Sequence, residues 1–180
     1  NTLPELPDIR KTRYINEFGL SNYDGEQLTS SIEVATYFEE AVINVRNPKI
    51  VANLIISEIF KLASPDEFDV PFSPKYLSDL VTYLEDEKIN NNSAKKVIEE
   101  MWNTNKSPKE IIDEQDLEQI NDEKALEVII NEVLKTSEKA VNEYKSGKEK
   151  ALQSIVGKVM GKTRGRANPQ LTLQLLKEKI

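Results

Sequence analysis

The most suggestive chemical pattern is a run of glycines and lysines near the end of the sequence, Gly157-Lys158-Val159-Met160-Gly161-Lys162-Thr163. Its composition resembles the loop that cradles phosphates in nucleotide-binding proteins. That loop needs a longer spacing between its glycines and a β-strand directly before it. Here three residues separate the glycines, and the apolar residues before them recur with the period of a helix. The sequence therefore argues against a nucleotide-binding loop.

Glycines recur every four residues at Gly157, Gly161 and Gly165, which leaves one side of a helix without side chains. An interior glycine costs a helix about 1 kcal/mol relative to alanine. We therefore expect another backbone to approach this side closely. Two explanations stay open, a crossing of two helices inside the domain or contact with a nucleic-acid backbone.

Three cations within five residues follow, on a connection that ends at an Asn-Pro helix start. Cations and a helix N-terminus suit phosphate groups. No aromatic residue is interleaved, which argues against base stacking and favours backbone contact with structured RNA. We expect the connection to be flexible and solvated. The candidate nucleic-acid-binding residues are Lys158, Lys162, Thr163, Arg164, Gly165, Arg166 and Asn168.

Other chemistry is poorly supported. The chain has no histidine and no cysteine, which excludes imidazole bases, thiolate nucleophiles, disulfides and structural zinc. The carboxylate pairs lie opposite apolar stripes or at helix ends and are typical of solvated surface. We predict no catalytic residue, no metal ligand and no cofactor in this chain. The longest apolar runs are too short to span a membrane, so we expect a soluble, intracellular protein without a membrane partner.

Charge is unevenly distributed along the sequence. The whole chain carries a net charge of -7, but residues 145–180 hold nine Lys+Arg against two acidic residues. Residues 1–144 hold 15 against 29. This asymmetry favours an acidic body that carries a basic end for a polyanion. The alternative is an ordinary mixed surface with a basic tail.

Hydrophobic residues recur at helical spacing nearly everywhere, and no run alternates as a strand would. Capping residues precede prolines at Asn47, Ser73, Ser107 and Asn168, a pattern typical of helix starts. The sequence predicts helices at 7–17, 31–44, 47–63, 73–86, 91–104, 107–114, 121–135, 137–145, 148–162 and 168–179, and a loop at 64–72. We expect an all-α fold.

The polar segment 103–108 separates two strong apolar stripes and contains a proline. It is the best candidate for a boundary. We therefore predict two small helical domains, residues 1–106 and residues 107–180.

Several motifs together resemble one known family. The chain opens with Leu3-Pro4-Glu5-Leu6-Pro7-Asp8-Ile9-Arg10 and ends with Val156-Gly157-Lys158-Val159-Met160 and Thr163-Arg164-Gly165-Arg166-Ala167-Asn168-Pro169. These runs are similar to the junction and the tail of GatB, the B subunit of the aspartyl/glutamyl-tRNA amidotransferases. The tail is shared with the small YqeY-type proteins. The resemblance covers essentially the whole chain.

The resemblance implies a specific function. GatB proteins convert Glu-tRNA(Gln) or Asp-tRNA(Asn) into the amide with ATP, magnesium and ammonia, and their partners are the amidase subunit and the small subunit of the amidotransferase complex. The catalytic centre lies in a cradle domain that is absent here. The present segment resembles the helical domain and the YqeY-like tail that grip tRNA(Gln) or tRNA(Asn), in the bacterial cytoplasm or alternatively the mitochondrial matrix. Any ATP or magnesium site would belong to the full-length protein.

Two alternatives remain from the resemblance. One is a free-standing, YqeY-like, all-α interaction protein, which the opening Leu-Pro-Glu-Leu-Pro motif disfavours because such a protein has no cradle to join. The other is the archaeal-type E subunit of the Gln-specific enzyme, which shares this architecture. An independent enzyme is the weakest interpretation, since histidine, cysteine and a phosphate loop are all missing.

Overall fold

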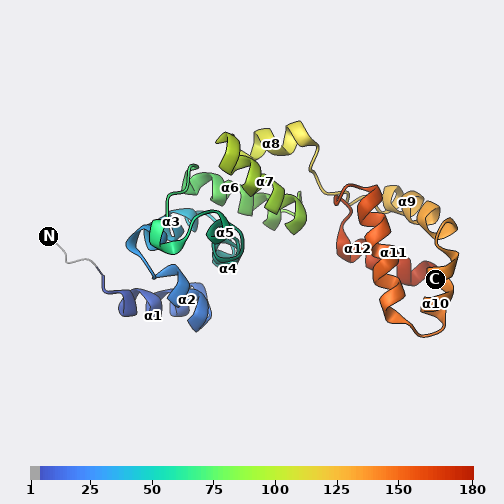
Figure 1. The fold of residues 1–180 in the computed structure, drawn as a ribbon, viewed down its shortest axis with the longest axis horizontal. Coiled ribbons are helices and arrows are strands. Elements are labelled where there is room, and N and C mark those ends of the chain that lie inside the picture. Colours follow the sequence, from blue (N-terminus) through green and yellow to red (C-terminus); the bar gives the residue numbers. More distant parts are fainter. Residues whose placement is uncertain (1–4) are drawn as a thin grey trace. The chain divides into compact units, whose positions relative to one another are not determined.

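The computed structural model describes residues 5–180, so Leu3 and Pro4 of the opening motif lie outside the described part. Helices form the whole fold, and the only strand-like feature between residues 5 and 180 is an isolated bridge. The predicted all-α class is confirmed. The chain divides into two compact units, residues 1–116 (unit 1) and residues 117–180 (unit 2), which are described separately (Figure 1).

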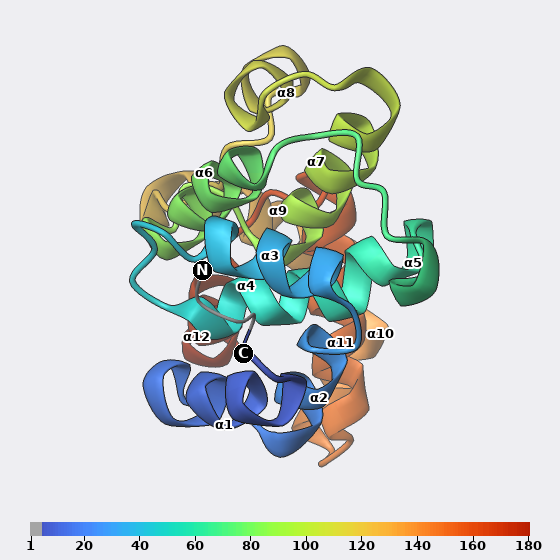
Figure 2. The same ribbon diagram turned by 90° about the vertical axis from the view of Figure 1, so that its left-hand side faces the viewer.

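Unit 1 is a bundle of short helices. They are α1 (Pro7–Phe18), α2 (Asn22–Leu28), α3 (Ile32–Ala41), α4 (Pro48–Leu54), a π-helical turn (Ile55–Ile59), α5 (Phe60–Leu62), a 3-10 turn (Pro65–Glu67), α6 (Pro74–Glu85), α7 (Asn91–Thr104) and α8 (Pro108–Gln115). Figure 2 shows α4, the π-helical turn and α5 as one continuous rod beside α3. The predicted helix at 47–63 is therefore present, with its middle turn widened.

Helices begin at each of the capping residues that the sequence predicted. Asn47 accepts a hydrogen bond from the Lys49 amide, and Ser107 forms a full capping box with Glu110. Such caps satisfy backbone donors that have no partner inside the helix. Ser73 is the exception, because its side chain makes no capping hydrogen bond although Pro74 begins α6 as expected.

The structure contains one helix, α2, between the predicted helices at 7–17 and 31–44, where the sequence predicted none. The short α2 has few apolar positions and carries Gly25 in its middle, so it gives no helical stripe in the sequence. Gly25 is buried because α1 packs closely there, and a Cβ at Gly25 would lie 3.2 Å from Lys11 Cγ. Tertiary contact between α1 and α2 therefore decides this helix.

A network of charged groups ties the opening motif to unit 1. Arg13 donates to both oxygens of Glu5 at 3.0 and 2.7 Å and to Glu39 of α3 at 2.6 Å. Arg10 adds a bond to Glu5 at 3.3 Å. The hydrogen bond from Arg13 holds the pKa of Glu5 below its usual value, against an opposing effect of desolvation. This network fixes the direction in which the chain enters α1.

The two compact units separate after Asp116, ten residues beyond the predicted domain boundary at 106/107. The segment 103–108 is a tight turn between α7 and α8, in which Asn105 adopts a left-handed conformation. Helix α8 packs against α6 and α7 and buries Ile111 and Ile112. A polar, proline-containing segment here marks a helix–helix turn inside unit 1.

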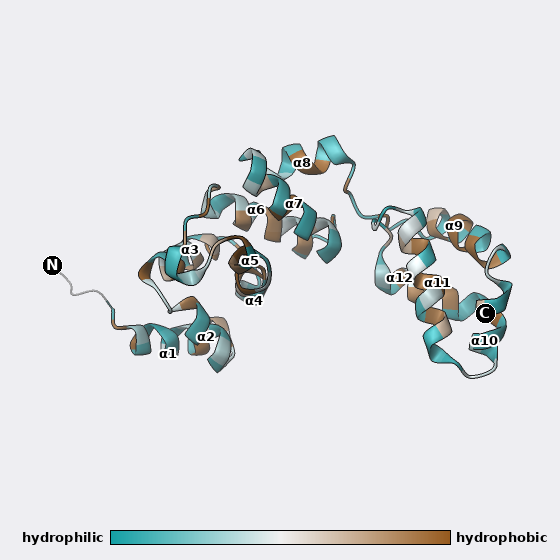
Figure 3. Cartoon of the chain, viewed as in Figure 1, coloured by the Kyte–Doolittle hydropathy of each residue, from teal (hydrophilic) through white to brown (hydrophobic). Residues whose placement is uncertain are grey.

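Unit 2 consists of α9 (Glu123–Lys135), α10 (Glu138–Lys145), α11 (Glu149–Lys162) and α12 (Pro169–Lys179). Its core combines apolar residues of α9, α11 and α12 with Ala167 of the turn between α11 and α12. The helical members are Leu126, Ile130, Val133, Leu152, Ile155, Val159, Leu175 and Leu176. Figure 3 shows hydrophobic residues recurring along α9 and α11, with hydrophilic residues between them. This core fixes which face of α11 is exposed. Across residues 5–180, we find no helix with the length and apolar character that a bilayer crossing requires.

Candidate nucleic-acid interface

Helix α11 turns one face to the core and the other to solvent. Its buried side chains repeat at helical spacing, as do the exposed positions on the opposite side. The centre of the exposed side, here called the glycine face, is formed by Ser154, Gly157 and Gly161, and Lys150 lies at its N-terminal end. These positions follow one another at intervals of three or four residues and so lie in one stripe. The stripe carries one cation and almost no side-chain bulk.

No neighbouring element covers the two helical glycines. A Cβ added at Gly157 or at Gly161 would meet nothing within 4 Å. The expectation of two helices crossing closely at these glycines inside the domain is therefore wrong. The side chains of α9 and α12 instead pack on the opposite, apolar side of α11. The two interior glycines lower the stability of α11, and no close packing contact within the described residues compensates this loss.

Two of the predicted cations lie at the edge of the glycine face that adjoins α9. Lys158 is exposed and donates from Nζ to Ser137 Oγ at 3.0 Å. Lys162 forms an ion pair with Glu132 of α9, and its side chain remains 48% exposed. The hydrogen bond from Lys162 lowers the pKa of Glu132, so this carboxylate stays charged in mildly acidic solution. Both ammonium groups are held beside the glycine face and remain open to solvent.

The segment from Thr163 to Asn168 is a hydrogen-bonded turn, so the expectation of a flexible connection is wrong, although Arg164 in this turn is exposed to solvent as expected. Arg164 and Gly165 adopt left-handed conformations, with φ of 55° and 83°. The Gly165 amide donates to Met160 O at 2.7 Å, and the Arg166 amide donates to Thr163 O at 3.1 Å. These bonds close the end of α11 and hold the turn in one shape.

Thr163 is buried, with 6% of its surface exposed, and its hydroxyl serves the fold. Thr163 Oγ1 donates to Val159 O at 2.9 Å and accepts from the Ala167 amide at 3.2 Å. Of the predicted site residues, Thr163 is therefore a positioning residue for the turn and offers no hydroxyl to a ligand. The sequence did not predict this burial, because the neighbouring residues Lys162 and Arg164 are charged and indicate an exposed segment.

The remaining predicted residues differ in how much they expose. Arg164 is exposed, and no ion pair of its guanidinium is found in the described part of the chain. Arg166 is half-buried, and its carbonyl accepts from the Ile120 amide at 2.8 Å in the isolated bridge. Asn168 caps α12 through the amides of Gln170 and Leu171, and its Nδ2 donates to an asparagine side chain of the 117–122 segment. Arg164 is the cation of the turn best placed for an external anion.

Lys150 is a residue that the sequence reasoning missed. It is exposed, and it lies on the same stripe as Gly157 and Gly161, two to three turns nearer the start of α11. Counting intervals of three and four residues backwards from the glycines would have found it. With Lys158, Lys162 and Arg164 it surrounds the glycine face with positive charge.

The charge asymmetry of the sequence coincides with the division into units. Residues 1–116 hold 12 Lys+Arg against 22 Asp+Glu, a net charge of -10, and residues 117–180 hold 12 against nine, a net charge of +3. A polyanion is therefore repelled by unit 1 as a whole and attracted by unit 2. The glycine face and its cations lie on unit 2, whose net positive charge favours binding of a polyanion.

These features define an all-α protein whose second unit presents a basic, glycine-lined helix. Comparison with known proteins gives the family. A family model described as "GatB domain" matches residues 36–180. The chain is 44% identical to the B subunit of the aspartyl/glutamyl-tRNA(Asn/Gln) amidotransferase of Caldanaerobacter subterraneus, over 99% of this chain and 38% of that protein.

Two further relatives carry the same name. The protein of Carboxydothermus hydrogenoformans is 43% identical over 99% of this chain and 38% of its own length. The protein of Thermotoga maritima is 40% identical over 98% of this chain and 37% of its own length. The chain belongs to the GatB family, as the resemblance of its motifs indicated. It spans about 38% of the length of these curated relatives.

Proposed function

We propose that this chain is the tRNA-binding portion of a GatB-type amidotransferase subunit, and that unit 2 supplies the contact with RNA. The observation that carries the proposal is the glycine face of α11, which is open to solvent and surrounded by Lys150, Lys158, Lys162 and Arg164. A helix side without side chains lets a sugar–phosphate backbone approach the peptide backbone. The cations at its edges then reach the phosphates.

The proposed recognition depends on shape and charge more than on base sequence. The predicted site residues include no aromatic side chain, so base stacking contributes nothing there. Phosphate contacts of this kind position a structured RNA without reading its sequence. The body and arms of a tRNA offer such a surface. Binding should therefore be similar for many tRNAs and should weaken as salt rises.

The relatives are named as B subunits of an aspartyl/glutamyl-tRNA(Asn/Gln) amidotransferase, and the resemblance of the motifs suggests the reaction of the whole protein. We propose that the full-length protein converts Glu-tRNA(Gln) or Asp-tRNA(Asn) into the amide with ATP and magnesium, together with its amidase and small partner subunits. The glycine-lysine run does not fit a phosphate-binding loop, because it is part of α11 and no strand precedes it in the described residues. The contribution of this chain is to bind and orient the tRNA.

The experiment compares two variants that lose the same charge. One is Lys150→Gln/Lys158→Gln/Arg164→Gln in unit 2, and the control is Lys49→Gln/Lys96→Gln/Lys109→Gln in unit 1, whose lysines are exposed. Affinity for an unmodified tRNA transcript is measured by filter binding at several salt concentrations. Each phosphate contact contributes roughly 0.7–0.9 to the slope of log affinity against log salt.

We expect the unit 2 variant to bind many-fold more weakly and to lower that slope by about two to three. The control should change both quantities little, because the lysines that it removes lie on the acidic unit. Equal losses in the two variants would mean that net charge alone governs binding, and the site on α11 would then be rejected. Circular dichroism of both variants checks that the helices are intact.

A further inference from the structure

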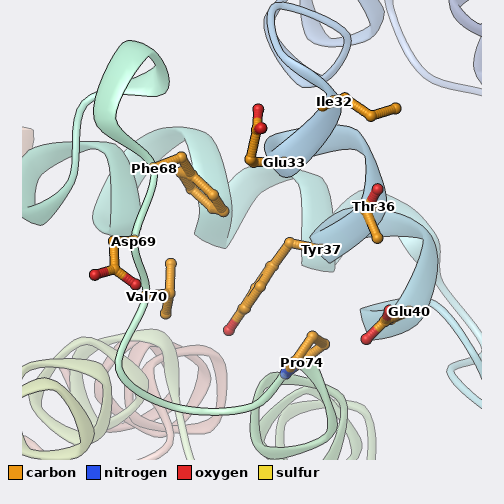
Figure 4. Close-up of a pocket in the computed structure, with 9 residues that line it drawn as sticks. All are labelled: Ile32, Glu33, Thr36, Tyr37, Glu40, Phe68, Asp69, Val70 and Pro74. Atoms are coloured by element: carbon orange, nitrogen blue, oxygen red, sulfur yellow. The ribbon is translucent and has the colours of Figure 1, made fainter.

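Unit 1 contains a shallow groove on the side of α3 that faces the segment after the 3-10 turn (Figure 4). Its volume is about 460 Å³, within the size range of ligand sites. The lining residues are Ile32, Glu33, Thr36, Tyr37, Glu40, Phe68, Asp69, Val70 and Pro74. We propose that this groove binds a segment of a partner protein in which an apolar side chain lies between two basic residues.

The middle of the groove is apolar. The rings of Tyr37 and Phe68 lie edge to face with their centroids 5.5 Å apart, and Figure 4 shows both directed into the groove with Val70 beside them. Ile32 at its upper edge is 52% exposed. Tyr37 itself is buried, with 9% of its surface exposed, whereas Phe68 and Val70 are half-buried. The accessible parts of Phe68, Val70 and Ile32 favour an apolar side chain as occupant, and guanidinium groups also pack on aromatic rings.

Carboxylates stand at the ends of this apolar floor. Glu33 and Glu40 leave the same side of α3, two turns apart, and Tyr37 lies between them (Figure 4). Asp69 adds a third negative charge from the segment after the 3-10 turn, which lines the other side of the groove. Within residues 5–180, none of these three carboxylates has an ion pair, and the nearby Lys75 is paired with Asp79.

The elements that form the groove have no cations of their own. Residues 31–44 and 64–74 together contain six acidic residues and no lysine or arginine. An RNA phosphate would be repelled here, whereas a basic segment finds complementary charge. A polyamine is a less suitable occupant, because it supplies positive charge but carries no branched apolar side chain that could pack on the apolar floor.

Glu40 has no evident role in the stability of the fold. It lies in the last turn of α3, where the helix dipole disfavours a negative charge, and no cation among the described residues compensates it. Glu33, in the first turn, is favoured by the dipole. A cationic partner that binds in the groove would offset the unfavourable position of the Glu40 carboxylate at the end of α3.

The geometry sets the spacing of the partner's charges. Seven residues of helix separate Glu33 from Glu40, a rise of about 10 Å. Alternate side chains of an extended peptide face the same side, and four residues of such a peptide cover about 13 Å, so the long side chains of basic residues at i and i+4 can reach both carboxylates. The proposed segment therefore carries basic residues at positions i and i+4 with an apolar residue at i+2. This inference concerns unit 1 and does not depend on RNA binding by unit 2.

The test uses the whole 180-residue chain and a synthetic probe, the acetylated and amidated peptide Gly-Ser-Arg-Ser-Leu-Ser-Arg-Ser-Gly. Binding is followed by amide chemical shifts in ¹⁵N-labelled protein. We expect saturable shifts at Thr36 and Val70. In the variant Glu33→Gln/Glu40→Gln the affinity should fall about three- to tenfold, the effect of two partly exposed charge pairs. The variant Glu99→Gln, an exposed carboxylate of α7, should bind as the unchanged protein does.

Stability separates the binding role from a structural one. Glu40→Gln alone should leave the melting temperature unchanged or slightly raised while it weakens the peptide. Loss of binding when serine replaces the leucine of the probe would support the role of the apolar floor. Equal affinity for spermidine, unchanged affinity in the double variant, or shifts at Thr36 and Val70 caused by tRNA alone would overturn the inference.

Discussion

Replacing both helical glycines of the glycine face by alanine should change stability and RNA affinity in opposite directions. A Cβ at Gly157 or Gly161 meets nothing within 4 Å, and neither glycine has a positive φ. Each substitution should therefore stabilise α11 by about 0.5–1 kcal/mol, the usual difference between glycine and alanine inside a helix. For Gly157→Ala/Gly161→Ala we expect about 1–2 kcal/mol in total.

The two effects are measured separately. Urea unfolding gives the gain in free energy, and thermal unfolding should show unit 2 melting roughly 4–8 °C higher for each kcal/mol gained. If the RNA backbone contacts this face, the two methyl groups remove one or two contacts. At about 1 kcal/mol for each contact, affinity for tRNA should fall about five- to thirtyfold.

Gly25→Ala is the matched control. Its Cβ would lie 3.2 Å from Lys11 Cγ, so this substitution in unit 1 should give no gain in stability, and RNA affinity should stay unchanged. A less stable Gly157→Ala/Gly161→Ala protein would show that the glycines are needed for packing after all. A more stable protein with unchanged affinity would refute the role of the glycine face in RNA binding.

Three further outcomes follow from the hydrogen bonds and ion pairs. Thr163→Val should destabilise unit 2 by about 1–3 kcal/mol in urea unfolding, because the Ala167 amide loses its partner, whereas Thr163→Ser should lose much less. Glu132→Gln should strengthen tRNA binding in filter assays, since it removes a negative charge and releases Lys162. Weaker binding would mean that the pair positions Lys162. The network of Glu5 should stabilise unit 1 fully above the ordinary carboxyl pKa of about 4.3 and lose this effect as pH falls through its lowered value. The difference in melting temperature between the unchanged chain and Glu5→Gln should therefore shrink from about pH 6 to about pH 3, and a constant difference would contradict it.

Local rules predicted most of the helices. Apolar stripes and caps such as Ser107 with Glu110 are determined within a few residues of sequence, and these helices agree within a few residues with the structure. Helix α2 was missed because Gly25 is placed by contact with α1 and not by helix propensity. The units separate ten residues beyond the predicted boundary because Ile111 and Ile112 are buried in contacts of α8 with α6 and α7, which local sequence does not reveal.

The candidate site was predicted in part. Its cations were visible in the composition of the sequence, and Lys158 and Arg164 are indeed exposed. The sequence did not reveal that Thr163 is buried or that hydrogen bonds fix the turn, because both depend on how α11 and α12 meet. The environment of Gly157 and Gly161 likewise required the packing of the whole unit.

Amide chemical shifts on addition of tRNA test most directly the claim that RNA binds to the glycine face. The chain has six glycines, and their amides provide probes in both units. We predict that the signals of Gly157, Gly161 and Gly165 shift or broaden, while those of Gly19 and Gly25 in unit 1 remain unchanged. Changes confined to Gly19 and Gly25, with α11 unaffected, would contradict the proposed interface.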